Sequence, residues 1–206
     1  MLGKAKKIIA NPFFIAFLFG IAFLHLTKAF AKFRAQSIPD PLVYVADWQL
    51  TDHLGRKVGK KDFLGKLIIA DFFFTSCPTI CPILTQSMKD LYSRLSDRSE
   101  EIVFLSITVD PKNDTKEVLN EFLIKNGLVH KNWFGLTGSP DEIKEVISQS
   151  MKVYVGDKDQ HAEHTIPHLA HLALFDKKGD LRGLFRTTPL ELSSMLEVVK
   201  ILLNTA

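Results

Sequence analysis

Residues 67–74 form an almost entirely apolar run with the sequence Leu-Ile-Ile-Ala-Asp-Phe-Phe-Phe. A strand with one face in water alternates apolar and polar side chains, so a continuous run of this length is typical of a strand buried on both faces. Such strands occur at the centre of α/β sheets, where helices cover both sides. The run therefore predicts that the rest of the chain supplies two covering layers.

The segments after this run alternate between helix and strand patterns. Residues 102–109 are a second apolar run, which ends at Asp110-Pro111, and residues 43–58 predict two short strands around a turn. The other expected elements are a helix over 83–95, a helix from Asp114 or Thr115 to about Lys125, a strand at 133–136, a helix from Ser139 to Ser150, a hairpin of 169–175 and 181–185, and a last helix over about 190–203. This order predicts a three-layer α/β domain with a central mixed sheet.

The N-terminal part of the chain carries a different signal. Residues 8–26 are 19 residues without Asp, Glu, Lys or Arg, and a helix of that length spans roughly the 30 Å hydrocarbon core of a bilayer. The apolar region of a signal peptide is usually only about 7–15 residues long, which favours an uncleaved anchor over cleavage near residues 29–31. We expect an anchor over 1–27, a tether over 28–41 and a folded domain over 42–206.

The distribution of charge agrees with this division. The 206 residues contain 26 Lys and Arg and 23 Asp and Glu, a net charge of +3. Residues 1–36 hold six of the basic residues and no acid, so the rest of the chain has a net charge of −3. So weak a charge does not indicate binding to nucleic acid. Two cysteines are also too few for a disulfide framework or an all-cysteine zinc site.

The two cysteines, Cys77 and Cys81, directly follow the first apolar run, and prolines flank them at Pro78 and Pro82. Proline is tolerated in the first turn of a helix, so a helix is expected to begin near Cys81, with Cys77 on the preceding loop. Amide N–H groups and the positive end of a helix stabilise a thiolate at such a place and lower its pKa. A close pair of thiols is suited to disulfide exchange or to binding a soft metal. Redox motifs usually separate the cysteines by two residues rather than three, but the longer spacing does not exclude a disulfide.

A metal site would need a third ligand, and four of the seven histidines are clustered at His161, His164, His168 and His171. His168 and His171 are three residues apart at the start of an expected strand, so they would face opposite sides of the sheet. Only one of them can face the cysteines. Two thiolates and one imidazole suit Cu(I), and the same set can bind Cu(II) with an added water or carboxylate. Zinc is a further alternative, although structural zinc usually has four ligands.

The most specific patterns lie in the segments 72–82, 105–115, 135–138 and 168–185. The first joins three phenylalanines to the proline-flanked cysteines, and the second contains Asp110-Pro111 followed by Asp114-Thr115. Together they resemble the Sco/SenC family of membrane-anchored copper proteins, which have a thioredoxin-like fold. The likeness covers about residues 45–204.

The resemblance implies that Cys77, Cys81 and one histidine are ligands of copper, as Cu(I) or Cu(II). In the family, the ligand histidine lies 11 residues before the glycine of the last hairpin, and counting back from Gly179 selects His168. Asp110 corresponds to a position that the family keeps near the metal. We therefore expect Asp110 to contact the ligand residues without binding the metal itself, to shape the turn, or to do both.

The chain departs from the family pattern around this histidine. Pro167 stands where many members have Asp, and Leu169 stands where they commonly have Ser or Thr. His164 lies in Glu-His-Thr, which is similar to the common Asp-His-Thr, but its use as the ligand requires a four-residue insertion. His168 is thus the expected ligand and His164 the alternative.

The function implied by the resemblance is that of a copper chaperone that helps to assemble the dinuclear copper centre of a respiratory cytochrome c oxidase. Its expected partners are the copper-bearing subunit of that oxidase, other copper chaperones and a membrane. The expected location is the bacterial inner membrane with the domain in the periplasm, or the mitochondrial inner membrane in a eukaryote.

The competing interpretation is a thiol–disulfide oxidoreductase. In that case the Cys77–Cys81 pair reduces the cysteines of the target site or acts as a redox sensor. A peroxidase is disfavoured, because the sequence offers no evident arginine partner for the first cysteine.

Overall fold

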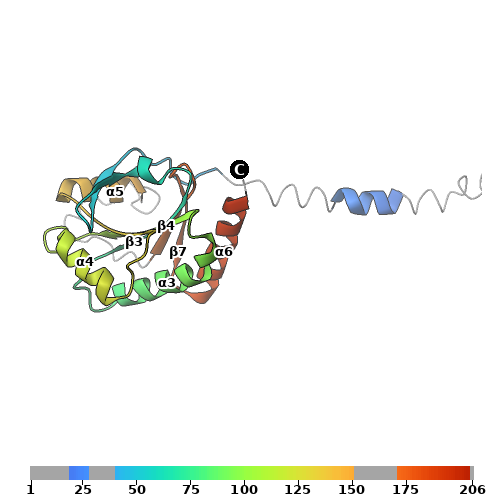
Figure 1. The fold of residues 1–206 in the computed structure, drawn as a ribbon. Helices are drawn as coiled ribbons and strands as arrows, with labels where there is room; N and C mark the ends of the chain where they lie inside the picture. Colours follow the sequence, from blue (N-terminus) through green and yellow to red (C-terminus); the bar gives the residue numbers. More distant parts are fainter. Residues whose placement is uncertain (1–18, 28–39, 151–170, 205–206) are drawn as a thin grey trace, which may run out of the picture. The chain divides into compact units, whose positions relative to one another are not determined.

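The computed structural model describes residues 19–27, 40–150 and 171–204 (Figure 1). The chain divides into two compact units, Met1–Pro39 and Asp40–Ala206, and the described part of the first unit is a helix at 19–27. Within the described residues, no helix is both long enough and apolar enough to cross a membrane. Most of the expected anchor at 8–26 lies outside the described residues, and the anchor therefore stays a prediction.

The described part of the second unit is built on a seven-stranded sheet with the order β2-β1-β5-β4-β3-β6-β7. Strands β3, β4 and β5 run parallel to one another, and every other neighbouring pair is antiparallel. The strands are β1 Gln49–Asp52, β2 Lys57–Gly59, β3 Leu67–Phe73, β4 Ile102–Thr108, β5 Trp133–Thr137, β6 His171–Phe175 and β7 Leu181–Arg186. This arrangement confirms the predicted mixed sheet.

Helices cover both faces of the sheet. The α-helices are α3 Cys81–Arg94, α4 Lys116–Lys125, α5 Pro140–Ser150 and α6 Pro189–Asn204, and short 3₁₀ helices lie at Lys60–Phe63 and Ser96–Arg98. Figure 1 shows α5 on one side of the sheet and α3, α4 and α6 on the other. All seven residues of β3 and of β4 are buried, which confirms the prediction from the apolar runs.

The two faces of β3 pack against different layers, because successive side chains of a strand point to opposite faces. Ile68 and Phe72 belong to a cluster that includes Val146 of α5. Phe73 belongs to a second cluster, which includes both cysteines and Leu119 of α4. The cysteines therefore lie on the side of the sheet that α3 and α4 cover.

The helix beginnings follow the local signals in the sequence. The Thr115 side chain accepts a hydrogen bond from the Val118 N–H at 3.4 Å and caps α4. At α5, the Ser139 side chain and Glu142 exchange hydrogen bonds with each other's N–H groups at 3.2 and 2.7 Å, which is a capping box. These bonds satisfy amide groups that have no partner within the helix.

One expected strand begins later than the sequence pattern predicts. In the segment 43–58, the first strand begins at Gln49, because Val43 forms an isolated antiparallel bridge with Leu181, the first residue of β7, instead. The predicted strand 169–175 is described from His171 onward as β6. Residues 169 and 170, like His168, lie outside the described residues, so the separation of His168 from His171 by strand alternation stays a prediction.

The register brings several chain segments to one edge of the sheet. Because β3, β4 and β5 are parallel, with Phe73 opposite Thr108, their C-terminal ends lie together. Strand β6 is antiparallel to β3 and begins at this same edge, with Leu172 opposite Asp71. We call this end of the sheet the cysteine edge, and residues 74–80, which follow β3 there, the cysteine loop. Ligands of α/β sheets commonly bind at the carboxyl ends of the strands.

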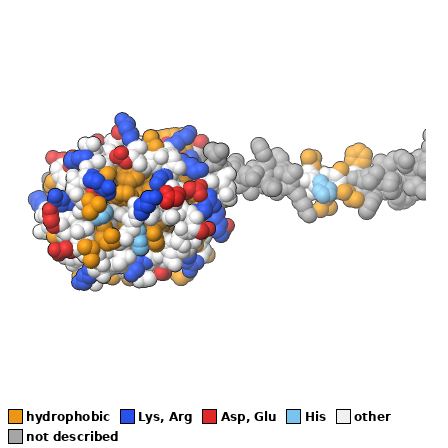
Figure 2. All heavy atoms as spheres, in the orientation of Figure 1, with side chains coloured by type: hydrophobic (Ala, Val, Ile, Leu, Met, Phe, Trp, Pro, Cys, Tyr) orange, Lys and Arg blue, Asp and Glu red, His pale blue; other side chains and the backbone are white. Residues whose placement is uncertain are grey.

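The face of the folded unit that Figure 2 shows carries charges of both signs. Figure 2 shows Lys and Arg side chains interspersed with Asp and Glu side chains over the visible face. This agrees with the small net charge of the chain after its basic first segment.

Candidate metal centre

The cysteine loop connects the central strand to the first turn of α3. Cys77 lies in the loop, and its N–H donates to the Phe74 carbonyl at 3.2 Å. Cys81 is the first residue of α3, followed by Pro82, where the missing N–H of proline costs no helical hydrogen bond. The predicted start of this helix is thus confirmed. Cys77 and Cys81 are 7% and 5% exposed, and both are free thiols.

The Cys77 thiol has an unusually low pKa. Burial by itself would raise the pKa, but hydrogen bonds to its sulfur from the Cys81 side chain and from the backbone of Thr79, Cys81 and Ile80 outweigh this and lower it to about 6. The Thr79 hydroxyl lies 3.8 Å from the same sulfur. N–H groups at the start of a helix favour the thiolate, so Cys77 is largely ionised at neutral pH.

Cys81 behaves in the opposite way. Burial raises its pKa to about 12, and the hydrogen bond with Cys77 and the negative charges of Cys77 and Asp71 add to the rise. The two shifts have opposite directions, so the pair favours the thiolate on Cys77 and the thiol on Cys81. In such a pair, the thiolate can bind a cation or attack a disulfide directly. The thiol must first release its proton before it can bind or attack.

A buried carboxyl group on β3, Asp71, is a further member of the site that the sequence analysis did not single out. It is 1% exposed, and burial raises its pKa to about 7, against the opposing effect of a hydrogen bond with Ser106. Its Oδ1 atom has no hydrogen-bond partner. The signal in the sequence was a single acid inside the apolar run 67–74, because an acid is rarely fully buried without a partner.

The predicted histidine ligands are placed only in part. His161, His164 and His168 lie outside the described residues. His171, the first residue of β6, is half-buried, and burial together with the charge of Arg186 lowers its pKa. Among residues 19–27, 40–150 and 171–204, no three His, Cys, Asp or Glu side chains gather in a set that can hold a metal ion. The described structure thus brings together two of the three predicted ligands, Cys77 and Cys81.

Asp110 follows β4 at the cysteine edge. Its carboxylate accepts a hydrogen bond from the Asn113 side chain at 2.7 Å, and its carbonyl accepts from the N–H groups of Asn113 and Asp114 at 3.1 and 2.9 Å. Asp110 therefore shapes the turn before α4, which is one of its two expected roles. Its expected support of a metal ligand stays a prediction.

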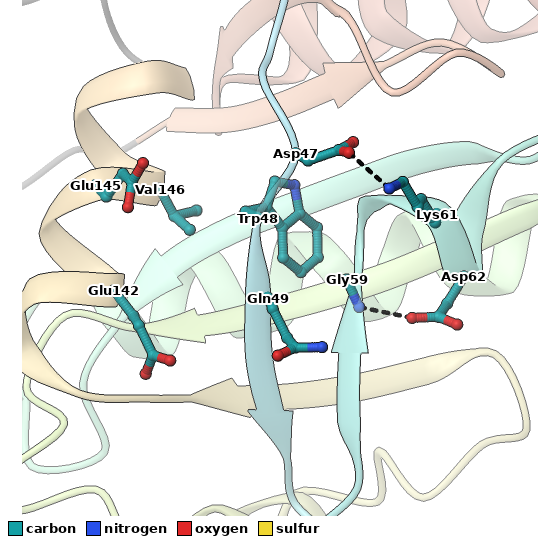
Figure 3. Close-up of a pocket in the computed structure, with 9 residues that line it drawn as sticks. All are labelled: Asp47, Trp48, Gln49, Gly59, Lys61, Asp62, Glu142, Glu145 and Val146. Carbon is teal, nitrogen blue, oxygen red and sulfur yellow. Dashed lines mark hydrogen bonds and ion pairs between the residues drawn. The ribbon is translucent and has the colours of Figure 1, made fainter.

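A pocket of about 580 Å³ on the other side of the sheet does not belong to this site (Figure 3). It lies between α5 and the β1–β2 hairpin, and its acidic side chains have partners of their own. Asp47 pairs with Lys61 at 2.9 Å, and Asp62 accepts from the Gly59 N–H at 2.7 Å. Figure 3 shows the carboxylates spread around the pocket rather than pointing to a common centre.

Known proteins have sequences similar to that of this chain. The chain is 34% identical over 162 residues to the SCO1 protein homolog of Bacillus subtilis, which covers 78% of this chain and 81% of that protein. It is 35% identical over 134 residues to the SCO2-like protein RT0576 of Rickettsia typhi, and this match spans 64% of either chain, less than two thirds.

Two solved structures extend the comparison to the fold. BsSco, a member of the Sco family of cytochrome c oxidase assembly proteins in which a disulfide switch was identified, has a TM-score of 0.67 and 30% identity, over 82% of this chain and 99% of that one. Yeast Sco1 with copper bound has a TM-score of 0.61 and 26% identity, over 77% and 89%. The family model SCO1/SenC matches residues 37–204. On its sequence and its fold, the chain belongs to the SCO1/SenC family.

Proposed function

We propose that the protein binds copper through Cys77, Cys81 and His168 and passes it to the copper-bearing subunit of a cytochrome c oxidase. The observation that carries this proposal is the pair of thiols at the cysteine edge, one of them with a pKa lowered to about 6. Yeast Sco1 binds copper on the same fold, and BsSco belongs to a family of cytochrome c oxidase assembly proteins. Copper is here a cargo rather than a permanent cofactor.

The chemistry of the two cysteines suits this cargo. Thiolates are the ligands that Cu(I) prefers, and Cys77 supplies one without first losing a proton. Cys81 must release its proton to become the second ligand, so binding is coupled to pH. Cys77 lies in the loop that joins β3 to α3 and Cys81 is the first residue of α3, so a partner that displaces the segment over these buried side chains reaches the metal and takes it by ligand exchange.

His168 is the proposed third ligand, with His164 as the alternative. The structure places Gly179 in the turn between β6 and β7 with a φ of +75°, which supports the glycine from which the family spacing is counted. β6 begins at the cysteine edge with His171. His168 precedes His171 by three residues, a separation of at most about 10 Å along the chain.

The proposal also includes a membrane anchor and a location for the folded domain. The run 8–26 anchors the chain in a membrane, the bacterial inner membrane or its mitochondrial equivalent, and the folded domain lies on the outer side, where the oxidase copper centre is assembled. Carbonate extraction tests the anchor, since an apolar helix of this length resists removal by salt or high pH.

A thiol–disulfide oxidoreductase remains the second candidate function, because one specific observation favours it. The difference in pKa between Cys77 and Cys81 is what a disulfide exchange needs, with one thiolate to attack and one thiol to resolve the mixed disulfide. In this role the pair reduces the two cysteines of the oxidase site and becomes a disulfide itself.

Copper analysis of the full chain separates these functions. The reduced wild-type protein is expected to hold one copper per chain, Cys77→Ser and Cys81→Ser to lose tight binding, and His168→Ala to weaken it more than His164→Ala, His161→Ala or His171→Ala. The smaller effect for histidine follows because the two thiolates still hold Cu(I). Full copper occupancy in either cysteine variant contradicts the site. Reduction of a target disulfide by a wild-type protein that binds no copper supports the oxidoreductase instead.

A further inference from the structure

Asp114 is a buried acid at the cysteine edge, and its carboxylate accepts three hydrogen bonds. It is 1% exposed. The Thr75 N–H donates to Oδ2 at 3.0 Å, the Thr75 hydroxyl donates to Oδ1 at 2.5 Å, and the Thr108 hydroxyl donates to Oδ2 at 2.6 Å. Two of the three bonds thus come from Thr75, which belongs to the cysteine loop and lies two residues before Cys77.

Asp114 is itself held in place by segments outside the cysteine loop. Its carbonyl accepts from the Thr137 hydroxyl at the end of β5 at 2.9 Å, and its N–H donates to the Asp110 carbonyl at 2.9 Å. It directly precedes Thr115, the residue that caps α4. Because these contacts do not involve the cysteine loop, Asp114 provides a fixed point to which the beginning of the loop is attached.

The far end of the cysteine loop is fixed by α3. There, the Thr79 hydroxyl lies 3.8 Å from the Cys77 sulfur, and hydrogen bonds from the backbone of Thr79, Ile80 and Cys81 lower the pKa of the Cys77 thiol. Such bonds weaken steeply as their length and angle depart from the optimum. A loop attached at both ends holds the sulfur in range of these groups, whereas a loop attached at one end lets it move away.

We propose that Asp114 is a positioning residue of the thiol pair: by holding Thr75, its carboxylate sets where the Cys77 sulfur stands relative to the amide groups at the start of α3. The inference deepens the proposed function and rests on it in one respect, namely that the Cys77–Cys81 pair is the working site. A residue with a merely structural role would add stability to the fold and leave the chemistry of Cys77 unchanged.

A matched pair of variants separates the two roles. Thr75→Val and Thr137→Val each remove one hydroxyl that donates to Asp114 and keep a β-branched side chain. Only Thr75 belongs to the cysteine loop; Thr137 bonds the carbonyl of Asp114 and not its carboxylate. Both substitutions are therefore expected to lower the free energy of unfolding, by about 1 kcal/mol each. Only Thr75→Val is expected to change the thiolate fraction of Cys77.

The measurement is the rate at which iodoacetamide alkylates Cys77 in the reduced, metal-free full chain, followed by mass spectrometry of the labelled peptide. The ratio of the rates at mildly acidic and mildly basic pH reports the thiolate fraction, because differences in access cancel. With pH values of about 6 and about 9, a loss of one pKa unit of thiolate stabilisation reduces this ratio about fivefold. We expect that reduction in Thr75→Val, no change in Thr137→Val, and the wild-type ratio in Thr75→Ser, which keeps the hydroxyl.

Equal ratios in the wild type, Thr75→Val and Thr137→Val would overturn the proposal, as would an equal reduction in both valine variants. Asp114→Asn provides a second measurement if Thr75→Val does not fold, and it is expected to change the ratio in the same direction. The assay contains no copper. A chain that shows the expected ratios but fails to bind copper therefore contradicts the proposed function and leaves the positioning role of Asp114 in place.

Discussion

The turn between β6 and β7 and the cysteine edge both bury acidic groups, but they balance the negative charge differently. In the turn, Asp176 and Asp180 are 5% and 7% exposed and form ion pairs with Arg182 and Lys60 at 2.6 and 3.1 Å. At the cysteine edge, Asp71 forms no ion pair with any residue in the described part of the chain, and its Oδ1 has no hydrogen-bond partner.

The contrast follows from the cost of burying charge. A buried carboxylate stays ionised when a cation and N–H groups compensate for lost water, and otherwise it takes up a proton. The turn provides that compensation, with the N–H groups of Lys178 and Asp180 also donating to Asp176. At the cysteine edge, no ion pair among the described residues compensates for the burial of Asp71 and Cys81, and the pKa values of both groups rise. The comparison therefore predicts that the turn contributes to stability through its ion pairs and that Asp71 makes the stability depend on pH.

The largest expected change in the free energy of unfolding comes from breaking an ion pair in the turn between β6 and β7. Asp176→Ala removes the carboxylate that pairs with Arg182, whose side chain is 16% exposed, and it removes the acceptor of two backbone N–H groups. We expect a loss of about 3–5 kcal/mol in the free energy of unfolding, measured by urea denaturation. A loss below about 1 kcal/mol would show that the buried pair is compensated by water instead.

The second prediction concerns the unbalanced carboxyl group of Asp71. Its pKa is raised from 3.8 to about 7 in the folded protein, so the folded state binds this proton more tightly than the unfolded chain. The resulting stability is fully present below the unfolded pKa and is lost as the pH rises through the folded pKa. Between about pH 4 and about pH 7, the wild type is expected to lose roughly 2–4 kcal/mol of unfolding free energy relative to Asp71→Asn, which does not titrate.

Denaturation curves of both proteins across this pH range provide the measurement. Asparagine has nearly the same shape as aspartate, so the two proteins differ mainly in the titrating proton. Parallel dependence of stability on pH in the two proteins would mean that Asp71 keeps its ordinary pKa, and that a compensating group reaches it.

A third prediction sharpens the comparison within the cysteine edge. The pKa of Cys77 is lowered to about 6 and that of Cys81 is raised to about 12. At neutral pH, alkylation of the reduced chain is expected to modify Cys77 about a hundredfold faster than Cys81, after allowing for the higher nucleophilicity of the more basic thiolate. Peptide mass spectrometry at early times distinguishes the two. Equal labelling would contradict the assigned roles of the two thiols.

The smallest change in the free energy of unfolding is expected at an exposed ion pair. This pair serves as the reference for the buried pair of Asp176 and Arg182. Lys131 and Glu100 approach to 3.0 Å, with side chains 85% and 74% exposed. Lys131→Met is expected to change the unfolding free energy by at most about 1 kcal/mol. The measurement is the same urea denaturation as for Asp176→Ala. Effects of similar size in both variants would contradict the assignment of the turn as a special, buried network.

Much of the fold was predictable from local patterns. The apolar runs at 67–74 and 102–109 match β3 and β4 within one residue, and Pro82 places the start of α3 at Cys81. Strand burial and helix starts depend on periodicity and backbone preference, which neighbouring residues determine. The bridge between Val43 and Leu181 was not predictable in this way, because it joins residues far apart in the sequence.

The candidate site also has one part that was predictable from local sequence and one part that was not. The sequence by itself determined that two thiols meet at the junction of a buried strand and a helix, because the spacing and the prolines are local facts. Only the tertiary structure decided that Asp114, one of the two residues at which the sequence predicts the helix to begin, directs its carboxylate to Thr75 and Thr108 while Thr115 caps α4. It also decided that Asp71 lacks a cation and that the two thiols differ in pKa. The charge state of a group depends on which distant segments surround it, and packing brings those segments together.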